Sequence, residues 1–228
     1  MDNETLMLAG VIVGPLLLIV LAFALWKQAE KKRRQALSET AALIGFSYEE
    51  TSSSLPERFL HFEIFTKGHS KRATSILKGR TLQAEAWVLD YRYTTGGGKS
   101  SSTHVQTVCL LSSPDLALPH FTLRRELAFV DHLVEAFIGQ DIDFEEDPEF
   151  SKKVALRGES VDAVRQLFRP EVRAHVQHYA ERRFQLEGRD TTLLVDCNRL
   201  VKPTEIRDLL VELSTTVGIL KEACRGRW

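Results

Sequence analysis

The first stretch of this sequence whose residues suggest chemistry is a glycine-rich loop. Gly98-Lys99-Ser100 resembles the end of a phosphate-binding loop, in which backbone amides surround a phosphate and a lysine neutralises it. The leading glycine of that motif would fall at position 93, which is Tyr93, and strands are predicted on both sides of the loop. Because glycine and serine also suit a flexible hairpin tip, we favour a hairpin over nucleotide binding.

Carboxylates and histidines suggest metal chemistry at two further places. The stretch from Gln140 to Glu149 contains six carboxylates, but it lacks the alternating spacing and the central glycine of an EF-hand loop. His175 and His178 lie three residues apart on a predicted helix, with no third ligand at a recognisable spacing. We therefore predict a solvated acidic surface and no metal site.

Local spacing gives no Ser-His-Asp, Cys-His or metal-ligand constellation. If the protein is an enzyme, its site is dispersed along the chain, and the candidates are His104, His120 and the acidic stretch from Asp141. The three cysteines are few and far apart, so we interpret them as reduced thiols rather than a disulfide framework or a zinc site: Cys109, Cys197 and Cys224. No cofactor is implied, and the catalytic residues remain unknown.

The elements that must position these groups follow from hydrophobic periodicity and turn residues. Strands are predicted at 46–48, 73–78, 82–93, 103–111, 121–124, 154–157, 184–186 and 192–196. Turns are expected at Lys78-Gly79-Arg80 and Gly188-Arg189-Asp190. Helices are predicted at 55–68, where three phenylalanines spaced by three residues indicate core packing, and at 126–138, 160–169, 171–183 and 202–224.

All of these elements follow an uninterrupted apolar run from Leu6 to Trp26. At about 1.5 Å per residue, this run spans roughly the 30 Å of a bilayer core as one helix. Acidic residues precede it, and Lys27, Lys31, Lys32, Arg33 and Arg34 follow it. Because basic flanks stay in the cytoplasm, we expect a single-pass membrane protein with its N-terminus outside. Residues 1–5 would form a short outer tail, 6–26 the transmembrane helix, 27–45 a basic juxtamembrane helix and 46–228 a cytoplasmic domain.

The apolar run also contains residues that suggest a membrane contact and a partner. Trp26 suits the membrane interface, where the basic cluster that follows it would contact anionic lipids. Gly10 and Gly14 form a GxxxG pair that would allow two such helices to dimerise. A cleaved signal peptide is the alternative, since Ala22-Phe23-Ala24 imitates a cleavage site, but the positive charge lies on the wrong side of the run.

The order of features resembles that of bacterial membrane-anchored proteins of unknown function. The resemblance covers most of the chain and rests on Leu43-Ile44-Gly45-Phe46, Leu55-Pro56, Gly79, Asp90-Tyr91-Arg92-Tyr93, Gln106-Thr107-Val108, Leu118-Pro119-His120-Phe121, Asp141-Ile142-Asp143-Phe144 and Pro148-Glu149-Phe150. It implies one cytoplasmic domain on a bacterial inner membrane. It transfers no catalytic residue, because such families have no assigned activity.

The composition after the apolar run is that of a soluble domain. The chain has a net charge of −1 and 43% hydrophobic residues, so no excess of positive charge points to nucleic acid. Runs of strands followed by a terminal ββα unit predict an α+β fold, with an antiparallel sheet of about six to eight strands packed against helices that include a long C-terminal one. We expect a membrane-tethered binding or scaffold module for a protein partner or an apolar ligand. The alternative is a membrane-anchored enzyme with a dispersed His/carboxylate site.

Overall fold

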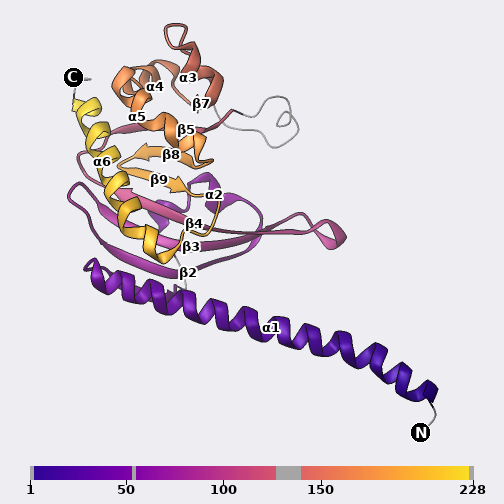
Figure 1. The fold of residues 1–228 in the computed structure, drawn as a ribbon. Coiled ribbons are helices and arrows are strands. Elements are labelled where there is room, and N and C mark those ends of the chain that lie inside the picture. Colours follow the sequence, from indigo (N-terminus) through magenta and orange to yellow (C-terminus); the bar gives the residue numbers. More distant parts are fainter. Residues whose placement is uncertain (1–2, 53–54, 127–139, 226–228) are drawn as a thin grey trace.

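The computed structural model describes residues 3–52, 55–126 and 140–225, except the side chains of residues 3–16, Lys99 and Gln140 (Figure 1). In chain order, the elements are α1 (Asn3–Leu43), β1 (Ser47–Thr51), η1 (Glu57–Phe59), α2 (Glu63–Thr66), β2 (His69–Arg80), β3 (Glu85–Thr95), η2 (Gly98–Ser100), β4 (Ser102–Ser112), β5 (Leu118–Arg125), β6 (Gln140–Asp141), α3 (Pro148–Lys153), β7 (Val154–Gly158), α4 (Val161–Leu167), α5 (Pro170–Glu181), β8 (Gln185–Asp190), β9 (Thr192–Asp196), η4 (Pro203–Glu205) and α6 (Ile206–Arg225). The predicted helix at 126–138 lies almost wholly outside the described residues.

The strands form one antiparallel sheet in the order β1-β2-β3-β4-β9-β8-β5-β7-β6. The α+β class and the antiparallel sheet are therefore confirmed. The described sheet has nine strands rather than six to eight, and the additional one, β6, is two residues long. The hairpin of β8 and β9 lies between β4 and β5, so the two halves of the chain share one sheet.

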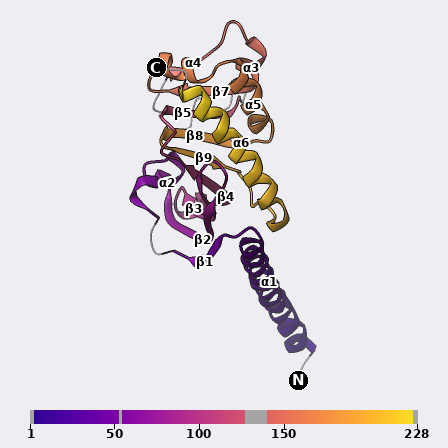
Figure 2. The same cartoon turned by 90° about the vertical axis from the view of Figure 1, so that its left-hand side faces the viewer.

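Helices cover one face of the sheet, and the phenylalanine-rich segment covers the other (Figure 2). On the first face, α6 buries the residues that recur at helical spacing, as predicted: Ile206, Leu209, Leu210, Leu213, Val217 and Leu220. On the second face, Phe59, Phe62 and Phe65 are buried, which confirms that this stripe belongs to the core. The single predicted helix there is instead the 3-10 turn η1 followed by the four-residue α2.

Two predicted turns lie a few residues from their expected places. The strand β2 runs through Gly79 to Arg80, and the turn follows at residues 81–84. Gly79 packs against the ring of Phe46, and a Cβ at this position would lie 2.3 Å from Phe46 Cδ1. In the same way, β8 contains Gly188, where a Cβ would lie 2.1 Å from Phe121 Cε1. These glycines are required for close aromatic packing rather than for a turn.

α1 is one continuous helix that extends well beyond the sheet (Figure 1). Its C-terminal part docks on the sheet, where Leu37 and Ala41 are buried. Farther toward the N-terminus, large apolar side chains are exposed at Leu17, Leu18, Ile19, Val20, Leu21, Phe23, Leu25 and Trp26. Among the described residues, no helix is both long and apolar enough to cross a membrane. Residues 6–16 of the predicted span, with Gly10 and Gly14, have side chains outside that description.

An arginine from the basic cluster fixes α1 to the sheet. Arg33 Nε and Nη2 donate to the two carboxylate oxygens of Asp90 on β3, each at 2.8 Å, and Arg33 Nη1 donates to the Val201 carbonyl at 2.8 Å. The hydroxyl of Thr107 also donates to Asp90, at 2.9 Å. Because both side chains are largely shielded from water, this two-pronged pair holds α1 in a defined orientation.

Candidate functional site

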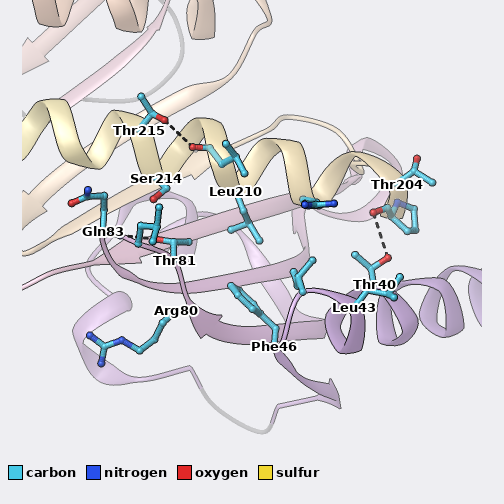
Figure 3. Close-up of a pocket in the computed structure, with 15 residues that line it drawn as sticks. Thr40, Leu43, Phe46, Arg80, Thr81, Gln83, Thr204, Leu210, Ser214 and Thr215 are labelled. Atoms are coloured by element: carbon cyan, nitrogen blue, oxygen red, sulfur yellow. Dashed lines mark hydrogen bonds between the residues drawn. The ribbon is translucent and has the colours of Figure 1, made fainter.

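A groove of about 990 Å³ lies between the end of α1, the β2–β3 turn and α6 (Figure 3). Its volume lies at the upper end of the range of small-molecule sites, which is about 300–1,000 Å³. Three segments far apart in the sequence line it: Thr40, Leu43, Ile44 and Phe46; Arg80, Thr81, Leu82 and Gln83; and Pro203, Thr204, Arg207, Leu210, Val211, Ser214 and Thr215.

Local contacts define each wall of the groove. Thr40 Oγ1 lies 3.5 Å from the Pro203 carbonyl, which joins the end of α1 to the start of α6. Phe46 N donates to the Ala41 carbonyl at 2.8 Å and so closes the last turn of α1 after Gly45, whose φ is +74°. At the other wall, Lys221 Nζ of α6 donates to the Gln83 carbonyl at 2.5 Å. Hydrogen bonds within the protein therefore hold these walls in place.

The groove has an apolar surface that is unusually exposed. Leu43 is 86% exposed, Leu82 99% and Val211 62%, and Figure 3 shows Leu210 pointing from α6 toward Phe46. Large apolar side chains that gather at one concave place indicate a surface that another molecule covers.

Two arginines contribute the charge of the groove. Arg80 comes from β2 and Arg207 from α6, so each of these walls supplies one guanidinium. Within the described part of the chain neither forms an ion pair, and none of the residues that line the groove is acidic. Unpaired guanidinium groups beside an apolar surface suit a ligand with an apolar chain and an anionic group.

The structure separates the residues of the predicted membrane-interface cluster. Arg33 is bound to Asp90, and Arg34 forms ion pairs with Glu30 and Glu50. Trp26, Lys27, Lys31 and Lys32 are exposed, and the ammonium of Lys27 lies 5.0 Å from the ring centroid of Phe23. The contact of this cluster with lipid stays a prediction, with Lys27, Lys31 and Lys32 as its exposed cations.

The structure does not bring the candidate catalytic residues into contact with one another. His104 stacks on Tyr93 at 4.8 Å and hydrogen-bonds Thr95, whereas Asp141 pairs with Arg157. His120 instead lies between two glutamates that sequence spacing did not indicate: Nδ1 is 2.8 Å from Glu159 and Nε2 is 3.2 Å from Glu187.

The Glu187 side of this His120 cluster has little room for a substrate. The cavity that Glu187 lines is about 20 Å³, which accommodates about one water molecule. Glu187 also accepts a hydrogen bond from Glu63 N at 2.8 Å, so it connects β8 to α2. These contacts give the cluster a role in holding the fold together.

Stability is expected to depend on pH through His120. The hydrogen bond to Glu187 and then the bond to Glu159 raise the pKa of His120 above its ordinary value, against the opposing effect of burial. Because the folded state binds the proton more tightly, this contribution is complete below pH 6.5 and is lost as pH rises through the raised pKa. In urea denaturation from pH 5.5 to 9, the free energy of unfolding of the wild type should fall relative to that of His120→Gln as the pH rises.

The control for this titration is His69→Gln, because the described structure shows His69 bonded to Ser70 and to the Gly96 carbonyl and to no carboxylate. It measures the effect of removing an imidazole that faces no carboxylate in the described structure. A difference between wild type and His120→Gln that stays constant over this range would contradict the assignment.

The other motifs serve structural roles. Gly98–Ser100 is the single turn η2 at the tip of the β3–β4 hairpin, which confirms the hairpin interpretation. His175 hydrogen-bonds Thr216 and His178 contacts Glu212, so both join α5 to α6. Among the described residues, no three His, Cys, Asp or Glu side chains are placed to hold a metal ion. All three cysteines are buried, and no disulfide links them.

Comparison with known proteins shows a shared fold. No protein-family model and no curated protein matches this chain. The crystal structure of the mycobacterial trehalose monomycolate transport factor A, TtfA, superposes with a TM-score of 0.55 at 16% sequence identity, over 85% of this chain and 93% of that chain. At this identity the likeness extends to the fold alone.

Proposed function

We propose that this protein is a membrane-tethered, non-catalytic module that binds an anionic amphiphile in the groove between α1 and α6. The observation that carries the proposal is the combination of an exposed apolar surface with the unpaired guanidinium groups of Arg80 and Arg207. The acyl chain would contact Leu43, Leu82 and Val211, and the anionic group would bind the arginines.

The tether is the apolar run from Leu6 to Trp26. It is long enough for a bilayer, and its exposed part projects from the domain without contacts to the sheet (Figure 1). Exposing so many large apolar side chains to water costs free energy, and a bilayer would cover them. The basic residues that follow support a topology in which residues 27–45 and the domain 46–228 lie on the cytoplasmic side of the inner membrane, with residues 1–5 outside.

The structural neighbour supports the choice of ligand class. TtfA is named as a trehalose monomycolate transport factor, and its fold resembles this one over most of both chains. A lipid-binding or scaffold role for the present chain is consistent with that likeness. The enzymatic alternative has less support, because the cavity that Glu187 lines beside His120 is only about 20 Å³.

The test is photo-crosslinking of the full-length protein in lipid nanodiscs. The probe is a palmitic acid that carries a diazirine, and palmityl alcohol with the same diazirine tests the role of charge. Crosslinked peptides identified by mass spectrometry should contain residues 43–46, 80–83 or 203–215. Labelling elsewhere only, or equal labelling by the acid and the alcohol, would contradict the proposal.

Substitutions in the groove make the test specific. We expect Arg80→Gln/Arg207→Gln to reduce crosslinking by the acid about tenfold, the combined effect of two exposed ion pairs. Val211→Asp should block the acyl chain by placing a charge on the apolar surface, without unfolding an exposed position. Arg125→Gln/Lys152→Gln removes the same charge from exposed positions on β5 and α3 and should leave crosslinking unchanged.

A further inference from the structure

Two exposed arginines lie directly opposite each other at the end of the sheet. Arg72 on β2 and Arg92 on β3 are cross-strand partners, and Val105 on β4, 45% exposed, is the next residue in the same row. Like charges in this position repel and destabilise the pair. In the described structure neither arginine has a carboxylate partner. Two adjacent arginines without a carboxylate partner indicate a binding site for an anion that comes from outside the chain.

The sequence around the pair contains cations without acids. There is no aspartate or glutamate from Thr66 to Ala84, nor from Tyr91 to Pro114. The nearest carboxylate on the same strand face is Asp90, two residues before Arg92, and Arg33 already occupies it. The end of the sheet that leads into the β3–β4 hairpin is therefore positive.

α1 extends toward this same end of the sheet. The start of β1 is bonded to the end of α1 through Phe46 N and the Ala41 carbonyl, and farther along both elements Arg34 pairs with Glu50. Since β1, β2 and β3 are successively antiparallel, the direction toward the N-terminus of α1 is also the direction toward the hairpin. Figure 1 shows the hairpin and the N-terminal half of α1 projecting from the same side of the molecule.

The position of Trp26 on α1 can be compared with that of Arg92 on β3, because the Arg33–Asp90 pair joins the two elements. From Arg33, Trp26 lies seven residues back, on the same side of the helix and about 10 Å along its axis. From Asp90, which binds Arg33, Arg92 lies two residues onward, about 7 Å along β3. Measured along each element from the Arg33–Asp90 pair, Trp26 and Arg92 therefore both lie toward the hairpin end of the sheet, about 10 Å and 7 Å away.

We infer that Arg72 and Arg92 form a second membrane contact, which binds the phosphates of anionic lipids and holds the domain against the bilayer surface. This inference rests on the proposed tether. A lipid surface is the occupant because the tether itself would bring the pair to headgroup level, and because exposed Val105 suits the interface beside it. The contact would fix the orientation of the groove relative to the membrane.

The experiment measures the distance of the hairpin from lipid headgroups in the full-length chain. Ser101→Cys places a fluorophore beside η2, since Ser101 is exposed and the native cysteines are buried. Nanodiscs contain a nitroxide headgroup quencher in phosphatidylcholine, either alone or with about 30% phosphatidylglycerol. Quenching should be strong with phosphatidylglycerol, weak without it, and reduced by high salt.

Charge variants separate this contact from the tether. Each cation near an anionic leaflet strengthens association about fivefold, so Arg72→Gln/Arg92→Gln should lower the ratio of docked to undocked domain about 25-fold. Arg125→Gln/Lys152→Gln should leave it unchanged. Equal quenching with both lipids, or quenching unaffected by the arginine variant, would overturn the inference while the chain still co-elutes with nanodiscs. Failure to co-elute would overturn the tether and this inference together.

Discussion

Asp90→Ala is expected to release α1 from the sheet and to cost about 3 kcal/mol of stability. The substitution leaves the Arg33 guanidinium, which is 19% exposed, without its carboxylate, and it removes the acceptor of the Thr107 hydroxyl. Removing one partner of a shielded ion pair costs about 3–5 kcal/mol, because the remaining charge is uncompensated. Urea denaturation of the detergent-solubilised chain measures the loss, and hydrogen exchange of residues 34–41 locates it.

The neighbouring arginine provides the matched control. Arg34→Gln removes ion pairs with Glu30 and Glu50 that are more exposed, so its cost should stay below about 1 kcal/mol. Equal losses for Asp90→Ala and Arg34→Gln would show that the Arg33–Asp90 pair does not anchor the helix. Because α1 forms one wall of the groove, Asp90→Ala should also reduce crosslinking of the acyl probe.

Leu18→Arg/Leu21→Arg is expected to abolish membrane association. Both leucines are exposed on the free part of α1, in the run that we propose crosses the bilayer. An arginine at the centre of a membrane helix costs about 2.5–3.5 kcal/mol on insertion scales, so two near the centre cost up to about 5–7 kcal/mol. Carbonate extraction of cell membranes should find the wild type in the pellet and the variant in the supernatant.

Leu60→Arg is the control for this loss, because Leu60 is exposed in the domain, outside the apolar run. That variant should stay in the membrane pellet. The orientation is checked by a tag fused after Trp228, which should resist protease added to intact cells. A soluble wild-type chain, or a digested tag, would contradict the proposed anchor or its direction.

The fold was largely predictable because its signals are local. Alternating apolar residues define the strands, and helical spacing from Ile206 to Leu220 defines α6. The two errors in turn position share one cause: Gly79 and Gly188 were interpreted as turn residues, although each accommodates an aromatic ring that comes from elsewhere in the sequence. A single sequence does not distinguish a glycine needed for a turn from one needed for packing.

The candidate site was not predictable, for a related reason. The groove joins three segments centred near residues 43, 82 and 210, and no local pattern indicates that they meet. Arg33 shows the same limit. Its place in a basic cluster predicts a contact with lipid, whereas its partner in the structure is Asp90, 57 residues away. Likewise, the repeated positive charge of β2 and β3 becomes a single surface only through the Arg72–Arg92 register.

The unbroken course of α1 has one more consequence. From Trp26 to Leu43 the helix rises about 25 Å, and the sheet is fastened to it partway along. With Trp26 at the membrane interface, this helix would hold the groove at a constant height above the lipid headgroups. An amphiphile would then enter the groove from the water above the headgroups, or from another molecule at that height, rather than by moving sideways within the bilayer.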